Sequence, residues 1–320
     1  MIEHLNSVAF LAYPEMIGLL QSELKNRFGI EKSPSSVYGD MLVYDLDALP
    51  EKNILPYWSK TTLLNPFILH FDSIGEAARE LKAIQRNWAP YQFTQFRRAS
   101  LIQEKLPYIN LKIKKFPFTV PQNPIGIYTL IDQNTLIASS QTSSFLPAGN
   151  LVLEEDHENP PSRAYLKLQE ALVRFCSHFE VSFPDENSRC FDAGACPGGW
   201  TWVLRQLGSK VFAVDRAELA PDLMSDTNVE FMKHDAFTLK PEDLGKFDWV
   251  FSDVICYPSR LYEWVNLWLE SGLVKNMICT IKMQGEIDWD LVQKFAEIPN
   301  SVVVHLNYNK HELTWMHCDK

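Results

Sequence analysis

Cys190-Phe-Asp-Ala-Gly-Ala-Cys-Pro-Gly-Gly-Trp200 is the stretch that decides the fold of this chain. Strand-like runs at 181–183 and 189–193 lead into it, and a helical pattern over 200–207 follows directly. Glycines let a backbone approach a ligand closely, and the first turn of a helix has free N–H groups. The stretch therefore predicts a nucleotide-like pocket at the carboxyl end of the first strand of an α/β sheet. Its glycine order is neither that of a dinucleotide fingerprint nor that of a Walker loop.

Helical and strand-like patterns alternate after residue 162. A helix is expected over 163–179, and only a short connection separates the last two strands. Parallel strands need long crossovers that usually contain a helix, whereas a short connection joins antiparallel neighbours. We therefore expect an α/β fold, a Rossmann-like domain over 151–320 with a mostly parallel seven-stranded sheet and an antiparallel last strand. Its strands are expected at 189–193, 210–215, 229–235, 247–253, 277–282, 301–306 and 313–317.

The first half of the chain is predicted to be a small α+β layer followed by a second region. A helix is expected to begin at Pro14 and end at Gly29, and the capping box Ser73–Glu76 predicts another helix. An acidic connector over 149–161 then separates the two halves. Strands are expected at 7–13, 37–39, 41–44, 63–71, 92–96, 126–131 and 135–139, with a basic helix over 100–106.

Composition bounds the class of protein. The chain has 320 residues and six cysteines, which show no CxxC pairing, so neither a disulfide framework nor a metal site is expected. There is no apolar run long enough to span a membrane, and the first residues lack the basic region of a signal peptide. We therefore expect a globular protein of the reducing cytoplasm.

One basic segment stands out in an acidic protein. The net charge is −10, yet residues 79–115 contain nine basic and two acidic side chains. Aromatic residues at positions 88, 91, 93, 96 and 108 lie among them. Such a segment fits a face that binds phosphates and stacks unpaired bases, or a solvated surface over core aromatics. The candidate RNA-binding residues are Arg86, Arg97, Arg98, Lys105, Lys112, Lys114 and Lys115.

Acidic residues end four successive strands of the second half, at Asp192, Asp215, Asp235 and Asp253. Ligands of open α/β sheets bind at these strand ends, and an acidic residue ending the second strand suits ribose hydroxyls. Lys282 ends the fifth strand within an apolar run, where an ammonium is costly unless paired. This favours a general base, and the alternative is a lysine at a strand end whose ammonium reaches solvent. By its pattern alone, Lys167 is interpreted as a solvated lysine on a helix.

Several of these segments resemble one family, the FtsJ-type ribose 2′-O-methyltransferases. Residues 192–200 are similar to its S-adenosylmethionine motif, and residues 161–168 resemble the segment with its first catalytic lysine. Residues 247–253, 280–282 and 311–314 resemble its later motifs. The resemblance implies methyl transfer from S-adenosylmethionine to a ribose of RNA, with Lys282 as the proton acceptor. It implies a catalytic tetrad of Lys167, Asp253, Lys282 and Glu312.

Residues 196–202 are closest to a branch of this family that methylates a cytidine ribose in 23S ribosomal RNA. Proteins of that branch carry a ferredoxin-like region and a THUMP domain before the methyltransferase domain. The resemblance thus implies a ferredoxin-like region over 1–87, a THUMP-like RNA-binding region over 88–150 and a methyltransferase domain over 151–320. It implies cofactor contacts at Ser162, Gly194, Cys196, Pro197, Gly198, Gly199, Trp200, Asp215, Asp235 and Asp253.

Alternatives remain for the substrate and for catalysis. The enzyme would act on another RNA, such as transfer RNA, or the chain would be a non-catalytic RNA-binding module that retains the cofactor fold. The four tetrad residues disfavour the module. A nicotinamide dehydrogenase is disfavoured by the order of the glycines.

Overall fold

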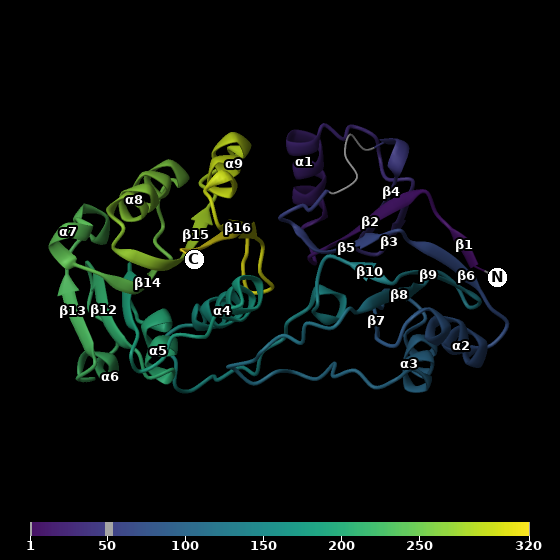
Figure 1. The fold of residues 1–320 in the computed structure, drawn as a ribbon, viewed down its shortest axis with the longest axis horizontal. Coiled ribbons are helices and arrows are strands. Elements are labelled where there is room, and N and C mark those ends of the chain that lie inside the picture. Colours follow the sequence, from purple (N-terminus) through teal and green to yellow (C-terminus); the bar gives the residue numbers. More distant parts are fainter. Residues whose placement is uncertain (1, 49–53, 320) are drawn as a thin grey trace. The chain divides into compact units, whose positions relative to one another are not determined.

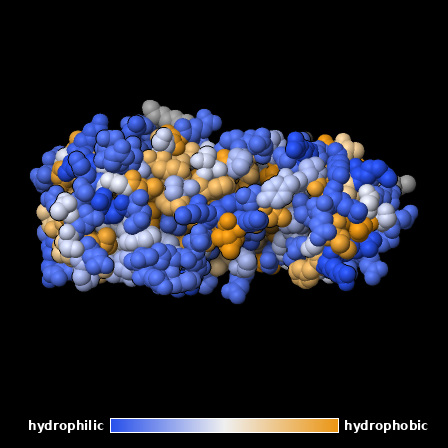
Figure 2. Space-filling view, turned by 90° about the horizontal axis from the view of Figure 1, so that it is seen from below, coloured by the Kyte–Doolittle hydropathy of each residue, from blue (hydrophilic) through white to orange (hydrophobic). Residues whose placement is uncertain are grey.

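The computed structural model describes residues 2–48 and 54–319, and the chain divides into two compact units. The first unit runs to Lys114 and resumes at Val120–Val152, and the second comprises Lys115–Thr119 and Leu153–Lys320. Among the described residues, no helix combines the length and the apolar character needed to cross a membrane. On the face seen in Figure 2, groups of hydrophobic residues lie between hydrophilic ones.

The first unit contains two five-stranded sheets, with strand orders β1-β6-β9-β8-β7 and β10-β5-β2-β4-β3 (Figure 1). Its strands are β1 (Ile2–His4), β2 (Ser7–Ala12), β3 (Ser36–Tyr38), β4 (Met41–Asp45), β5 (Ser59–Leu64), β6 (Phe67–His70), β7 (Trp88–Pro90), β8 (Gly126–Leu130), β9 (Thr135–Ser139) and β10 (Gln141–Thr142). Its helices are α1 (Ile17–Phe28), α2 (Ile74–Ile84) and α3 (Phe96–Lys105), with short 3₁₀ turns η1 (Leu46–Ala48) and η2 (Pro147–Gly149).

Alternating residues of these strands build two cores. Ile127 of β8 and Ile137 of β9 pack with Ala9 and Leu11 of β2, so the two sheets face each other. On the other side of β8, Tyr128 packs with residues of α2 and α3. Strands from both sides of residue 87 therefore share each sheet, because β6 pairs with β9 and β5 pairs with β10.

The strands of the first unit confirm one local prediction and correct two others. The hairpin around Gly39-Asp40 is confirmed, since β3 and β4 pair antiparallel. The single strand over 63–71 is wrong. Asn65 has a φ of 53° and Pro66 follows it, so the chain leaves one sheet with β5 and enters the other with β6. The strand over 92–96 is also wrong, because Phe93 stacks on Tyr91 in a loop and Phe96 begins α3.

The second unit holds a seven-stranded sheet with the order β13-β12-β11-β14-β15-β17-β16. The strands are β11 (Arg189–Ala193), β12 (Lys210–Asp215), β13 (Val229–Lys233), β14 (Phe247–Ser252), β15 (Val274–Lys282), β16 (Ser301–Val304) and β17 (Glu312–Cys318). The helices are α4 (Tyr165–Phe179), α5 (Gly199–Gln206), α6 (Pro221–Met224), α7 (Pro241–Leu244), α8 (Pro258–Ser271) and α9 (Trp289–Glu297), and η3 (Ala236–Thr238) is a 3₁₀ turn.

Strands β11 to β15 pair in parallel, and β17 runs antiparallel to both β15 and β16. The mixed α/β sheet with an antiparallel last strand is as expected, although that strand lies between β15 and β16 and not at the edge. The expected strand over 181–183 is wrong. Phe183 packs its ring against Phe116, 5.7 Å away between centroids, and this segment forms no ladder.

Candidate active site

Two glycines in the left-handed region shape the turn after β11. Gly194 has a φ of 82°, and a Cβ there would lie 2.1 Å from Cγ2 of Val254. Gly198 has a φ of 113°, and a Cβ there would lie 2.3 Å from Cδ1 of Leu223. Because other side chains rarely adopt these φ values and have no space here, both positions require glycine.

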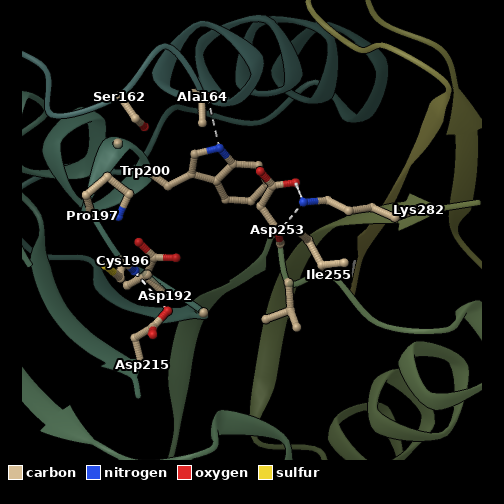
Figure 3. A pocket seen from close by; sticks show the side chains of 14 residues that line it. Ser162, Ala164, Asp192, Cys196, Pro197, Trp200, Asp215, Asp253, Ile255 and Lys282 are labelled. Carbon is tan, nitrogen blue, oxygen red and sulfur yellow. Dashed lines mark hydrogen bonds and ion pairs between the residues drawn. The ribbon is translucent and has the colours of Figure 1, made fainter. Parts of the chain in front are cut away.

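Asp215 at the end of β12 holds this turn. Its carboxylate accepts the backbone N–H of Cys196 and the backbone N–H of Ala217, each at 3.0 Å. Figure 3 shows Asp215 below the turn, with its bond to Cys196 dashed. A carboxylate has about four lone-pair positions, so Asp215 keeps capacity for donors such as ribose hydroxyls.

A cavity of about 380 Å³ lies beyond the carboxyl ends of β11, β12 and β14. This volume falls in the range of ~300–1,000 Å³ that small-molecule sites occupy. Most of the residues expected to contact a cofactor line it, whereas Gly198 and Asp235 do not. The lining residues are Ser162, Ala164, Asp192, Gly194, Ala195, Cys196, Pro197, Gly199, Trp200, Asp215, Asp253, Val254, Ile255 and Lys282.

Asp235 instead lies in a cluster with two arginines. Its carboxylate accepts from Arg216 and from Arg260, and it caps η3 by accepting the Phe237 N–H at 3.1 Å. Burial alone would raise the pKa of Asp235, but these donors outweigh it and lower that pKa. Its carboxylate is therefore already engaged.

Asp192 is the most buried acid of the cavity, with 1% of its surface exposed. One carboxylate oxygen accepts from the Thr201 hydroxyl at 2.7 Å. Burial raises the pKa of Asp192 to about 7, despite the Thr201 hydrogen bond that opposes the rise. A carboxyl group that titrates near neutrality therefore faces the cavity.

Four charged side chains converge at the edge of this cavity. Asp253 Oδ1 lies 2.9 Å from Lys167 Nζ and 3.1 Å from Lys282 Nζ. Lys167 Nζ also lies 2.6 Å from Glu312 Oε1. The structure thus brings all four residues of the expected tetrad into one connected cluster.

The register of the sheet explains how Glu312 arrives there. Lys282 is the last residue of β15, and Glu312, the first residue of β17, is its direct antiparallel partner. Asp253 follows β14, which is the neighbour of β15 on the other side. The reversed direction of β17 therefore brings its first residue to the carboxyl ends of the parallel strands.

The sequence pattern alone indicated that Lys167 is a solvated lysine. This interpretation is wrong, because Lys167 projects from α4 into the interior. It is 7% exposed, because its side chain turns inward to the two carboxylates. Burial alone would lower the pKa of Lys167, but Asp253 and Glu312 outweigh it and raise that pKa. Lys167 is thus held as a cation.

Lys282 has a different set of partners. Its Nζ donates to the backbone carbonyl of Asp253 at 2.6 Å and faces the shared Asp253 carboxylate (Figure 3). Two contacts leave one of the three positions around this nitrogen for a group in the cavity. Lys282 lines the cavity, whereas Lys167 does not.

Sequence reasoning missed some of the lining. Ile255, which is 77% exposed, and Val254 follow the tetrad aspartate and were not assigned a role. Ala164 lines the cavity and accepts the indole N–H of Trp200 at 3.0 Å, which ties α5 to the start of α4. The signal available in the sequence for Ile255 was an apolar residue two positions after the strand-end aspartate.

The predicted RNA-binding residues are divided between the units, with Lys115 in the second and the others in the first. Arg86, Arg97, Lys105 and Lys112 are exposed. Arg98 lies over the Phe71 ring at 5.6 Å. Lys114 donates to the Asn110 carbonyl at 2.6 Å, and burial lowers its pKa.

The aromatic residues of the basic segment divide into core and surface. Trp88 is fully buried, and its indole N–H bonds the carbonyls of Leu81 and Gln85, so it is wrong as a base-stacking candidate. Tyr91 is partly buried and stacks on Phe93, with 6.1 Å between ring centroids, so one face of its ring is covered. Phe96 and Tyr108 are exposed, at 59% and 76%.

Comparison with known proteins gives the class of the second unit. Residues 160–294 match the family model of the FtsJ-like methyltransferases. The expected resemblance to this family is thereby confirmed for residues 160–294. Among the described residues, no group of three or more His, Cys, Asp or Glu side chains could hold a metal ion.

Two curated relatives that match this segment are both named ribosomal RNA large subunit methyltransferase M (RlmM). That of Halorhodospira halophila is 39% identical over 125 residues, which are 39% of this chain and 36% of the relative. That of Aggregatibacter aphrophilus is 38% identical over 139 residues, 43% of this chain and 37% of the relative. The matches thus span little more than a third of the relatives' length. A solved structure of Aeropyrum pernix fibrillarin is 19% identical, covering 48% of this chain and 75% of that chain with a TM-score of 0.34.

Proposed function

We propose that the protein is an S-adenosylmethionine-dependent methyltransferase that modifies a ribose 2′-hydroxyl in 23S ribosomal RNA. The observation that carries the proposal is the cluster of Lys167, Asp253, Lys282 and Glu312 at the edge of a nucleotide-sized cavity. The family of residues 160–294 and the names of its relatives support the same activity.

The cavity suits S-adenosylmethionine because hydrogen-bond acceptors and a backbone without side chains line it. Its backbone passes without side chains at Gly194 and Gly199, where a Cβ would meet Val254 or Ser162. Asp215 suits the ribose hydroxyls, and the buried Asp192 suits a cationic amino group nearby. Ser162, Cys196, Pro197 and Trp200 complete the proposed contacts. Gly198 would shape the turn. Asp235 would accept a hydrogen bond from the adenine amine in place of a bond from one of its two arginine partners.

Bound S-adenosylmethionine would supply a methyl group whose bond to the sulfonium sulfur breaks as the bond to the ribose oxygen forms, leaving a neutral thioether. The attacking 2′-hydroxyl must lose its proton as the new O–C bond forms, so a base within hydrogen-bond reach is needed. Lys282 is the proposed acceptor because it lines the cavity and has an open position at Nζ. The proton would pass from the hydroxyl to the neutral amine of Lys282.

The other tetrad residues set charge and orientation. Lys167 remains an ammonium between two carboxylates and would stabilise negative charge that develops on the attacking oxygen. Asp253 would hold both lysines, and Glu312 would fix Lys167. Positioning of hydroxyl and methyl group supplies the remaining acceleration.

Most of the proposed RNA contacts belong to the first unit, and Lys115 belongs to the second. In this proposal, residues 1–87 correspond to a ferredoxin-like region, 88–150 to a THUMP-like region and 151–320 to the methyltransferase domain. Arg86, Arg97, Arg98, Lys105, Lys112, Lys114 and Lys115 would contact phosphates, with Phe96 and Tyr108 available for stacking. The protein would act in the cytoplasm.

Mapping of 2′-O-methyl groups tests the substrate. RNA from cells with the protein, without it, and with the Lys282→Ala variant would be compared at every nucleotide. The proposal predicts one 23S position that loses its mark in the last two samples. Loss of a mark in transfer RNA alone would replace the substrate, and no lost mark at all would contradict catalysis.

A further inference from the structure

A second cavity of the same unit, of about 460 Å³, has acidic and aromatic walls. Four of its lining residues are carboxylates of the acidic connector, against a single lysine, Lys115. The lining carboxylates are Glu154, Glu155, Asp156 and Glu158. None of the tetrad residues lines it, so this cavity is separate from the candidate active site.

A buried acceptor also belongs to this cavity. Gln169 lines it and is 7% exposed, and its Oε1 has no hydrogen-bond partner among the described residues. Tyr165 lies four residues earlier on α4, so the two side chains share a helix face, whereas Lys167 points elsewhere. A buried oxygen without a donor costs free energy, which a ligand with N–H groups would recover.

The carboxylates differ in how far they are neutralised. Glu155 pairs with Arg163 at 2.9 Å, and Asp156 accepts from the backbone and side chain of Asn159. Among the described residues, no hydrogen bond or ion pair engages the side chains of Glu154 and Glu158. Two negative charges of the wall are therefore available to a ligand.

The aromatic wall suits the same kind of ligand. Trp202 lines the cavity and packs edge-on against Tyr165, with 5.5 Å between ring centroids. The face of an indole attracts ammonium and guanidinium groups. Acceptors, negative charge and an aromatic face together select an organic cation and repel a phosphate.

We propose that this cavity binds an organic cation, an alkylammonium or guanidinium group. The group comes either from a free polyamine or from a lysine or arginine side chain of a basic protein chain. Glu154 and Glu158 supply the charge, Gln169 Oε1 accepts an N–H, and Trp202 packs against the cation. The inference does not rest on the proposed methyl transfer, because no residue assigned to that reaction takes part.

Calorimetric titration of the full chain tests the proposal, with spermidine in one arm and an acetylated arginine tripeptide amide in the other. We expect one saturable site for at least one of the two probes. Glu154→Gln combined with Glu158→Gln should weaken it about tenfold or more. The matched control, Glu218→Gln with Glu230→Gln, removes two exposed charges of the same unit outside the cavity and should change affinity little.

Gln169→Leu separates a specific site from a general attraction of cations. The variant removes the acceptor without changing net charge and should weaken binding about fivefold or more. Spermidine binding alone assigns the site to a polyamine, and peptide binding alone assigns it to a basic chain. The proposal is overturned if neither probe binds, or if the cavity and control variants weaken binding equally. Binding of S-adenosylmethionine, measured in parallel, reports separately on the proposed function.

Discussion

Lys167 Nζ and Glu312 Oε1 lie 2.6 Å apart and join helix α4 to the first residue of β17. Their side chains are 9% and 15% exposed, so water screens the pair little. Asp253 shares the same ammonium and also pairs with Lys282 at 3.1 Å, so two lysines balance two carboxylates that come from distant parts of the chain. The cluster therefore contributes to the stability of the second unit as well as to the proposed reaction.

Replacing Lys167 by Met should destabilise the protein by about 3 kcal/mol near pH 8, because it leaves the largely buried carboxylate of Glu312 without its cation and leaves Asp253 with Lys282 alone. Urea unfolding near pH 8 measures it. Lys210→Met, at an exposed lysine of the same unit, is the control, and an equal loss in the two variants would refute the structural role.

The buried carboxyl of Asp192 predicts a pH dependence of stability. Its pKa in the folded protein is about 7, above the ordinary value of 3.8 that applies to the unfolded chain. Between these values the folded state holds a proton that the unfolded state has released, so stability falls as pH rises, by up to about 1.4 kcal/mol per pH unit.

Asp192→Asn cannot titrate and should lack this fall. Unfolding free energies at pH 5, 6 and 7 would be compared for the wild type, the variant and the exposed Asp222→Asn control. A variant curve parallel to that of the wild type would mean that Asp192 is ionised throughout.

Helix α3 offers a test of the RNA-binding surface. Arg97 and Lys105 are exposed, so Arg97→Glu with Lys105→Glu should leave the fold intact, weaken RNA binding and reduce the slope of log affinity against log salt by about 1–2. Lys25→Glu with Lys32→Glu, at two exposed positions outside the basic segment, makes the same change in net charge and is the control. Unchanged affinity and slope in the double variant would remove α3 from the binding surface.

The turn after β11 predicts a steric effect on the cavity. Gly194→Ala would place a Cβ 2.1 Å from Val254 Cγ2 at a φ of 82°, and both the strain and the contact should displace the turn. We expect at least about tenfold weaker binding of S-adenosylmethionine by calorimetry. Adding Val254→Ala removes the clash but not the φ strain, so it should restore affinity in part. Full affinity in the single variant would show that the cofactor does not approach this backbone.

The second unit was predictable because its strands are short apolar runs that end in charged or glycine residues. Asp253, Lys282 and the glycine turn lie at those ends, where the topology of a parallel sheet gathers them. Lys167 was harder to predict, since a helical pattern does not reveal that one lysine turns inward to two carboxylates. The sequence does not reveal that Gln169 Oε1 lacks a hydrogen-bond donor, because this depends on which donors the fold brings near it.

The first unit was less predictable because its pairing is non-local. β1 and β6 share a sheet with β9, and β10 pairs with β5, so a division drawn along the chain does not follow the sheets. The break at Asn65-Pro66 depends on a left-handed residue that apolar periodicity does not mark. Trp88 is an aromatic residue within a basic segment, as a base-stacking residue would be, and only the structure reveals that it is buried.

The central claim, that Lys282 accepts the proton of a ribose hydroxyl, is tested most directly by Lys282→Ala in a methyl-transfer assay with 23S ribosomal RNA. The account predicts that this variant binds S-adenosylmethionine with nearly the affinity of the wild type and transfers methyl groups at least about a hundredfold more slowly. Transfer at the rate of the wild type would contradict it.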